Sequence, residues 1–352
     1  MQIEKILATA VKYQASDIYI SVGIKPTLRI HGDLVPIAEH PILNKTIAEE
    51  YLLEIMSDAQ RKEFAESFDL DFALEIAGLA RFRVNLFIQN KGIGAVFRYI
   101  PSETKTLDDL NLPTQLKKIA EYKQGIVLVT GPTGQGKSTT LAAIIDEINR
   151  TRQCNIITIE DPIEFIHSNK SSIIHQREVG THTKSFKAAL RGALRESTDV
   201  ILIGEMRDHE TISLALTAAE TGHLVVSTLH TSGAAKSIDR VIDSFPSDQQ
   251  NQARIQLSES IRAIVWQQLI KGAAGNSRVA ALEIMFANNA ISNLIRKNKT
   301  YQISSVLETS LKDGMQTMKY AIEQLQNQGF INQKTALEYL HEFSNSLEDT
   351  QN

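Results

Sequence analysis

The 352-residue sequence predicts an α/β fold in which a small α+β domain precedes a parallel-sheet core and a run of helices. Three observations predict it. Apolar residues alternate in several segments of the first hundred positions, which is typical of half-buried strands. Four continuous apolar runs then alternate with helical patterns, as expected for buried parallel strands. Beyond residue 286 the apolar spacing is helical throughout.

The small domain is expected to span residues 1–100. Its apolar spacing predicts helices at 2–13 and 46–65, and strands at 17–22, 27–30, 34–37, 79–89 and 93–100. A polar stretch bounded by prolines, residues 101–113, follows this domain and is expected to act as a flexible linker.

The core is expected at residues 114–286. Its continuous apolar runs predict strands at 126–130, 155–159, 200–204 and 224–228, and helices are expected near 137–150, 184–196, 208–221, 232–244 and 248–270. A helical region at 287–345 and a polar tail at 346–352 complete the predicted organisation.

The bulk composition is that of an ordinary globular protein, with 42% hydrophobic and 22% charged residues. A formal net charge of −4 argues against a broad nucleic-acid-binding surface. The single cysteine, Cys154, excludes an intrachain disulfide and a four-cysteine zinc site. The same cysteine usage favours a protein of the reducing cytoplasm. We also expect no signal peptide and no transmembrane helix.

A phosphate-binding loop of the form G-x-x-x-x-G-K-[ST] occupies residues 131–138, between an apolar strand and a helix start. Glycines let the backbone of such a loop wrap closely around a polyphosphate, and the helix N-terminus adds partial positive charge. Lys137 is suited to the β- and γ-phosphates, and the Ser138 hydroxyl to Mg²⁺. The predicted phosphate-binding residues are Gly131, Pro132, Thr133, Gly134, Gln135, Gly136, Lys137, Ser138 and Thr139.

Carboxylates follow two of the predicted strands. Glu205 ends the run at 199–205 and is predicted to orient and deprotonate an attacking water and to approach Mg²⁺. Asp199, at the other end of that strand, is expected to be a turn residue. Glu160, Asp161 and Glu164 follow the strand at 155–159, and one or two of them would serve a Mg²⁺-water network. An acidic loop broken by proline is the alternative for these three.

Histidines bracket the predicted strand at 224–228, and arginines line the small domain. His230 is expected at the carboxyl edge, where it can contact the γ-phosphate, whereas His223 would face away from that edge. Arg81, Arg83 and Arg98 are candidates for stabilising the transferred phosphoryl group. A solvated face held by ion pairs is the equal alternative for these arginines.

Several motifs together resemble the type IV pilus retraction ATPases (PilT-like) of the secretion ATPase superfamily, over residues 3 to 330. Besides the loop, the resemblance is carried by Ile159-Glu-Asp-Pro-Ile-Glu164, Gly204-Glu-Met-Arg-Asp208, Ala219-Glu-Thr-Gly-His223, Thr228-Leu-His-Thr231, Arg81-Phe-Arg-Val-Asn85, Val96-Phe-Arg98 and Gly314-Met-Gln-Thr317.

The resemblance implies a PAS-like N-terminal domain and a RecA-like P-loop ATPase domain. It also implies a homohexamer that binds ATP and Mg²⁺ and pulls pilins from the fibre. The motor would be peripheral at the inner face of the cytoplasmic membrane and would act on an integral platform protein and beside a paralogous retraction ATPase. Glu205 would be the catalytic base, with Arg81, Arg83 and Arg98 on the phosphates. An accessory PilU-like ATPase and a nucleic-acid-translocating RecA-like ATPase are the alternatives, although we expect no nucleic-acid partner.

The sequence departs from the family pattern at a few positions. Gln135 replaces a serine in the phosphate loop, where only backbone contact is expected to matter. Tyr19 stands where a histidine is common, and the stretch at 196–199 also differs. Ser292 replaces an arginine in Ala290-Ile-Ser-Asn-Leu-Ile295, a motif that the family links to retraction. We expect this change to affect the coupling of ATP hydrolysis to retraction and not ATP hydrolysis itself.

Overall fold

The computed structural model describes residues 2–30, 32–100, 104–274 and 277–348. Its contacts divide the chain into two compact units. The first unit comprises residues 1–103 together with 162–166, and the second comprises residues 104–161 and 167–352.

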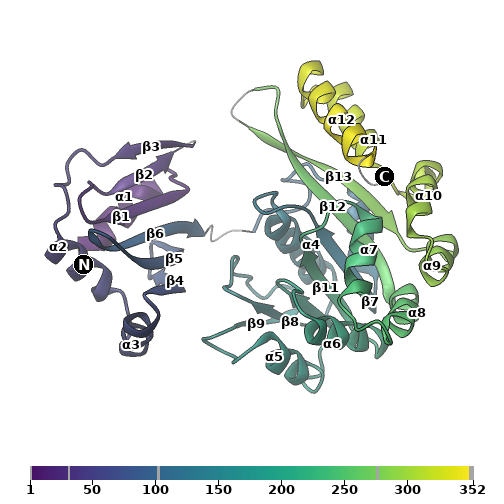
Figure 1. Ribbon diagram of the computed structural model, residues 1–352, viewed down its shortest axis with the longest axis horizontal. Coiled ribbons are helices and arrows are strands. Elements are labelled where there is room, and N and C mark those ends of the chain that lie inside the picture. The colour runs from purple at the N-terminus through teal and green to yellow at the C-terminus, as the bar shows by residue number, and fades with distance from the viewer. Residues whose placement is uncertain (1, 31, 101–103, 275–276, 349–352) are drawn as a thin grey trace. The chain divides into compact units, whose positions relative to one another are not determined.

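The first unit is an antiparallel sheet accompanied by helices (Figure 1). The strand order is β3-β2-β1-β6-β5-β4. Inward-facing residues of β5 and β6, with Phe82 and Phe97 fully buried, meet the apolar side of the first helix. The elements are α1 (Gln2–Lys12), β1 (Asp17–Ser21), β2 (Thr27–Ile30), β3 (Asp33–Pro36), α2 (Lys45–Glu54), α3 (Asp58–Ser67), β4 (Asp69–Ile76), β5 (Ala80–Gln89) and β6 (Gly92–Ile100).

The predicted single helix at 46–65 is wrong, because a capping box starts a second helix within it. The Ser57 side chain accepts from the backbone N–H of Gln60, and the Gln60 side chain accepts from the backbone N–H of Ser57. These reciprocal bonds satisfy two N–H groups that would otherwise lack partners at the start of α3. Strand β4, which follows α3, was not among the expected strands.

The second unit is built on a sheet with the strand order β13-β12-β7-β11-β10-β8-β9, in which only β13 runs antiparallel to its neighbour. A 3₁₀ helix (Thr114–Glu121) precedes it. The elements are β7 (Gly125–Thr130), α4 (Lys137–Thr151), β8 (Asn155–Glu160), β9 (Ile173–Glu178), α5 (Phe186–Ala193), β10 (Val200–Ile203), α6 (His209–Glu220), β11 (Leu224–Leu229), α7 (Ala234–Asp243), α8 (Gln250–Ser260), β12 (Ile261–Lys271) and β13 (Arg278–Phe286).

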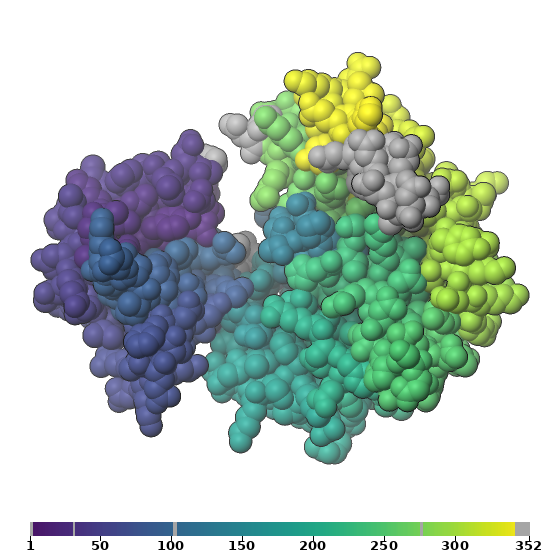
Figure 2. Space-filling model, viewed as in Figure 1, coloured from purple at the N-terminus to yellow at the C-terminus, as the bar shows by residue number. Residues whose placement is uncertain are grey.

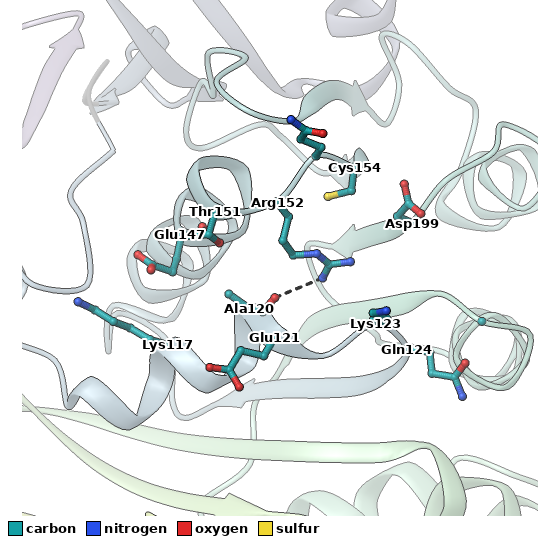
Figure 3. Close-up of a pocket in the computed structure, with 12 residues that line it drawn as sticks. Lys117, Ala120, Glu121, Lys123, Gln124, Glu147, Thr151, Arg152, Cys154 and Asp199 are labelled. Carbon is teal, nitrogen blue, oxygen red and sulfur yellow. Dashed lines mark hydrogen bonds between the residues drawn. The ribbon is translucent and has the colours of Figure 1, made fainter.

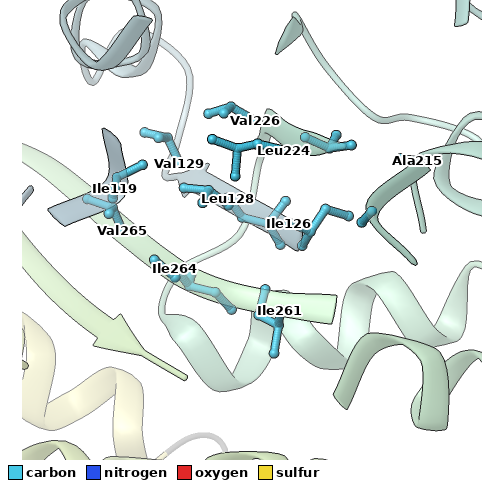
Figure 4. Close-up of a cluster of buried hydrophobic side chains, with 14 of the residues drawn as sticks. Ile119, Ile126, Leu128, Val129, Ala215, Leu224, Val226, Ile261, Ile264 and Val265 are labelled. Atoms are coloured by element: carbon cyan, nitrogen blue, oxygen red, sulfur yellow. The ribbon is translucent and has the colours of Figure 1, made fainter. Parts of the chain in front are cut away.

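The core of this unit surrounds the central strands (Figure 4). Every residue of β7 and β11 is buried, which is why both read as continuous apolar runs in the sequence. Side chains from β7, β11 and β12 meet here, with Ala215 of α6 beside them. The predicted α/β class, with a RecA-like core after a small α+β domain, is confirmed.

The predicted helix at 248–270 is wrong in its second half. Helix α8 ends at Ser260, and the next eleven residues form β12, which pairs in parallel with β7. The β-branched residues of β12 fit a pleated, buried surface better than a helix. Strands β9 and β13 were likewise not expected.

Helices follow β13, as predicted. They are α9 (Asn289–Arg296), α10 (Ile303–Thr309), α11 (Met318–Asn327) and α12 (Gln333–Glu348). Helices α11 and α12 pack against the β12–β13 hairpin, whereas α9 and α10 pack beside α8 and α7. Trp266 and Ile270 of β12 share a hydrophobic cluster with Met318 and Ile322 of α11. The C-terminal helices form the yellow and light-green surface in Figure 2. Of the predicted tail at 346–352, residues 349–352 lie outside the described part of the chain.

The segment Gly314-Met-Gln-Thr317 fixes the start of α11 against β13. Gln316 pairs through its backbone with Ile284, and its side chain donates to the carbonyl of Leu282. Thr317 caps α11 by accepting from Tyr320 N–H. The carboxyl of Glu283, the residue before Ile284, accepts from the N–H of Ala234, at the start of α7. This segment therefore holds the C-terminal helices to the edge strand of the sheet.

Part of the segment expected to be a linker is packed. Leu107 and Leu112 are buried in the core of the second unit, and residues 101–103 lie outside the described part of the chain. Across the residues that the structure describes, none of the helices combines the length and the apolar character that a membrane crossing requires.

Candidate active site

The phosphate loop connects the buried end of β7 to the first turn of α4. Gly131, Gly134 and Gly136 all have positive φ angles, of 143°, 78° and 77°. A side chain on Gly131 would also collide with the backbone oxygen of Gln267. Positive φ angles therefore favour glycine at all three positions, and the close approach of β12 adds a steric requirement at Gly131. Ser138 and Thr139 follow Lys137 in the first turn of α4, as the motif predicts.

The side chain of Lys137 is folded across its own loop. Its Nζ donates to the carbonyls of Gly131 at 2.8 Å and Pro132 at 2.9 Å. The residue is only 8% exposed. Nζ also lies 3.3 Å from Nδ1 of His230, which follows β11. The cation therefore sits between the loop carbonyls and the histidine.

Glu205 and His230 come together at the carboxyl edge of the sheet, as the sequence predicts. Glu205 follows β10 after Gly204, and His230 directly follows β11, the neighbouring strand. His230 Nε2 lies 3.1 Å from Glu205 Oε1. Thr133 of the loop is at the margin of this group, with its Oγ1 3.5 Å from His230 Nδ1. One tautomer fits these neighbours, with the proton on Nε2 toward Glu205 and Nδ1 accepting from Lys137.

Arg207 is a further partner of Glu205 that the sequence did not single out. Its Nη2 lies 2.8 Å from Glu205 Oε2. Partial burial alone would raise the pKa of Glu205, but the hydrogen bond and the charge of Arg207, together with the hydrogen bond from His230, lower that pKa below its ordinary value. Glu205 is therefore held as a carboxylate, which suits it to orient water and to accept a proton during a reaction.

Glu160 lies at the same edge as Glu205, since β8 neighbours β10 and Gly204 N–H donates to the carbonyl of Ile159. Thr158 donates to Glu160 Oε1 at 2.6 Å, so its own strand orients the carboxylate. Glu164 lies in the segment 162–166, which groups with the first unit.

The three candidate arginines share one side of the first-unit sheet. Arg83 and Arg98 are opposite each other on β5 and β6, and Arg81 lies two residues from Arg83. Each has a carboxylate partner within the unit, at 2.6 Å for Arg83–Asp71, 3.0 Å for Arg98–Asp17 and 3.8 Å for Arg81–Glu75. These ion pairs match the alternative interpretation of the sequence, a solvated face held by ion pairs. A role of the three arginines on phosphates stays a prediction.

A hollow of about 850 Å³ lies at the opposite edge of the sheet (Figure 3). Its lining includes Gln124, Cys154 and Asp199, which precede β7, β8 and β10. Asp199 accepts from Asn155 N–H, in keeping with the turn role expected for it. His223, at the same end of β11, has its Nδ1 3.0 Å from the Ala218 carbonyl oxygen. These residues are therefore remote from the phosphate loop.

Comparisons with known proteins agree with the fold and the motifs. The sequence model of the family described as "Type II/IV secretion system protein" matches residues 1–338. The chain is 49% identical over 338 residues to the type IV pilus retractation ATPase PilT of Pseudomonas aeruginosa, covering 96% of this chain and 98% of that one. It is 53% identical over 306 residues to a twitching motility protein of Neisseria gonorrhoeae, covering 87% and 82%.

A solved structure gives the same result. The chain superposes on a crystal structure described as the pilus retraction motor PilT with bound ADP, with a TM-score of 0.89, 44% identity and 96% coverage of both chains. Both the sequence relatives and this structure extend over the two units. The chain therefore belongs to the Type II/IV secretion system protein family, within its type IV pilus retraction ATPases.

Proposed function

We propose that this chain is an ATP-hydrolysing motor that drives type IV pilus retraction. The observation that carries the proposal is the unbroken set of contacts from Glu205 through His230 to Lys137. It joins three neighbouring strands at the carboxyl edge, where phosphoryl transfer needs a carboxylate for the water and a cation for the phosphates. The retraction ATPases among its relatives, and the ADP named with one of them, support the same reading.

ATP and Mg²⁺ are the proposed ligands of this edge. Residues 131–139 would hold the phosphates, with the Ser138 hydroxyl on the metal and Glu160 and Glu205 near it through water. In the described part of the chain, no three His, Cys, Asp or Glu residues are grouped so that they could hold a metal ion. A hydroxyl with two nearby carboxylates suits Mg²⁺, which takes most of its other ligands from phosphates and water.

Each proposed catalytic residue has a distinct task. Lys137 would exchange the loop carbonyls for phosphate oxygens, because hydrogen bonds to the carbonyls of Gly131 and Pro132 already hold its Nζ at the loop. Glu205 orients the attacking water and accepts its proton. His230 contacts both the Glu205 carboxylate and the Lys137 ammonium group and so fixes their positions relative to each other. Glu164 is a further candidate carboxylate. Arg81, Arg83 and Arg98 would leave their carboxylate partners and stabilise the phosphoryl group from this chain or a neighbouring one.

The proposed assembly is a homohexamer at the inner face of the cytoplasmic membrane. Its partners would be the platform protein of the pilus and a paralogous retraction ATPase. Ser292 lies in α9, in the motif that the family links to retraction, so we expect it to affect coupling rather than ATP hydrolysis.

An accessory retraction ATPase is the second candidate. The chain is 41% identical over 337 residues to the type IV pilus ATPase PilU of Pseudomonas aeruginosa, compared with 49% to PilT. The higher identity favours the main motor. A nucleic-acid motor is disfavoured by the net charge of −4.

A Glu205→Gln variant tests the proposal. ATP binding should persist while phosphate release falls by about 10²-fold or more, since one general base is removed. In a strain lacking the gene, the unaltered chain should restore twitching and clear piled-up surface pili, and the variant should not. Unchanged hydrolysis in the variant, or cells without pili after the deletion, would contradict the motor.

A further inference from the structure

One buried residue of β12, Gln267, contacts the phosphate loop and the helix after it through three different atoms. Its side-chain Oε1 accepts from Thr140 Oγ1 at 2.6 Å, and its Nε2 donates to the carbonyl of Gln135 at 2.6 Å. Its backbone oxygen lies against Gly131, where a Cβ would collide with it. Gln267 and Thr140 are each 2% exposed, so water does not compete for these bonds.

The loop returns a contact to the same strand. Gln135 Oε1 accepts from the backbone N–H of Leu269 at 2.7 Å, two residues beyond Gln267. The Gln267 side chain of β12 therefore bonds to the backbone of the loop, and the Gln135 side chain of the loop bonds to the backbone of β12. Gly136 completes the fit, because a Cβ there would lie 2.9 Å from Gln267 Nε2.

These contacts fix the part of the loop that must present N–H groups to phosphate. A phosphate-binding loop works by aiming several N–H groups at one point, so a small change in backbone direction weakens all of them together. Gln135 and Gly136 lie between the glycine turn and Lys137. The hydrogen bond from Gln267 Nε2 to the carbonyl of Gln135 sets the orientation of the peptide group between Gln135 and Gly136.

We propose that Gln267 and Gln135 form a brace from β12 that holds the phosphate loop in its binding conformation, with Gln267 as a positioning residue for nucleotide affinity. The inference rests on the proposed role of the loop in binding ATP and ADP. It goes beyond that role, because it assigns function to a strand outside the motif and to a side chain in the loop. A merely structural glutamine would instead affect folding stability alone.

The first test is the binding of fluorescently labelled ADP to the full chain. Gln267→Met keeps the volume but leaves the Thr140 hydroxyl and the Gln135 carbonyl without this partner, so affinity should fall about tenfold. Gln135→Ala removes one neutral hydrogen bond and should weaken binding by about three- to tenfold. Gln268→Met, on the other side of the same strand, is the matched control and should bind as the unaltered chain does.

Kinetics separate positioning from catalysis. The brace acts on the phosphates before and during the reaction alike, so both brace variants should raise KM for ATP and change kcat by less than about twofold. A reduced kcat with unchanged KM would overturn the proposal.

A Gln267→Glu variant supplies a pH-dependent readout of the brace, measured at pH values where circular dichroism shows that the variant is folded. In this buried position the introduced carboxyl has a raised pKa. When protonated, it donates to the Gln135 carbonyl and restores the brace; when ionised, it repels that carbonyl. ADP affinity of the variant should therefore rise as pH is lowered from 8 to 6, relative to the unaltered chain measured at the same pH values.

Lys137→Ala separates failure of the inference from failure of the proposed site. If this variant binds ADP normally, the loop is not the nucleotide site and the proposed function fails. If it abolishes binding while Gln267→Met, Gln135→Ala and Gln267→Glu bind ADP as tightly as the Gln268→Met control, the site stands and the brace is refuted.

Discussion

His230 Nε2 lies 3.1 Å from Glu205 Oε1, so a histidine after β11 and a carboxylate after β10 face each other across adjacent strand ends. The other ring nitrogen lies 3.3 Å from Lys137 Nζ. A single imidazole thus separates the proposed base from the proposed phosphate cation. Without it, the carboxylate would be free to pair with the lysine and withdraw it from the phosphates.

Replacing His230 with alanine should therefore reduce kcat by about 10²-fold, a typical contribution for a residue that orients an acid–base group. His230→Gln keeps one donor and one acceptor and should recover part of the rate. Phosphate release at saturating ATP measures the effect, and ADP binding provides the check on folding. Equal kcat in the alanine variant and the unaltered chain would show that the contact is incidental.

Arg207→Ala should move the acidic limb of the pH–rate profile to higher pH. Arg207 helps to lower the pKa of Glu205, so its removal raises that pKa. Activity that needs the carboxylate is lost as pH falls through the pKa, and a raised pKa brings this loss nearer to neutrality. Lys334→Ala, which removes an exposed pair with Glu338 on α12, should leave the profile unchanged.

Arg83 and Asp71 allow the role of the first-unit arginines to be tested. If Arg83 acts on phosphates, Arg83→Ala should reduce kcat by about 10³-fold, as loss of an arginine finger does. Asp71→Ala removes the same ion pair but leaves the arginine, and both partners are about one-third exposed, so stability should change by ~0–1 kcal/mol. Equal kcat values in Arg83→Ala and Asp71→Ala would show that Arg83 contributes only through its ion pair with Asp71.

His167 should make the second unit less stable in mild acid. Burial is the main reason that the pKa of His167 is lowered from 6.5 to about 4, and its Nδ1 has no hydrogen-bond partner among the described residues. Between these values the unfolded chain binds a proton that the folded chain does not, so stability falls as pH falls. From pH 7 to pH 5 the loss is about 2 kcal/mol, at 1.36 kcal/mol per pH unit below 6.5.

Urea unfolding of a His167→Gln variant checks this expectation, because the variant should lose that part of the pH dependence. His175, an exposed histidine on β9, provides the matched control as His175→Gln. A pH slope that is the same in His167→Gln and in the unaltered chain would contradict the assignment.

The sequence was sufficient to predict where candidate site residues lie wherever a local rule applied. The carboxyl ends of the strands of a parallel sheet lie at one edge. Three apolar runs in the sequence were therefore enough to predict that Glu205 and His230 lie near the phosphate loop. Buried parallel strands have an unmistakable composition, as β7 and β11 illustrate. The placement of Glu205 and His230 at this edge therefore needed no knowledge of side-chain packing, whereas the contact of Arg207 with Glu205 was not foreseen.

The brace could not be predicted in the same way. Strand β12 follows α8 without a glycine or proline, and its first residues continue a helical apolar pattern, so the boundary at Ser260 was missed. Gln267 meets Thr140 across 127 positions, a contact that no spacing rule supplies. The one available signal was a polar amide inside the run Ile264-Val-Trp-Gln267, which has to be satisfied once it is buried. Leu107 was missed because its neighbours are polar.

The backbone pairing of Gln316 with Ile284 bears on how this protein tolerates shortening. Strand β13 is the last strand on its side of the sheet, so its outer N–H and C=O groups depend on the returning chain for cover. A chain that stops before Gly314 would expose them, together with the apolar surface that α11 shields. Such exposed strands recruit other chains. Truncation here would consequently cause aggregation during expression even though every residue of the phosphate loop remained.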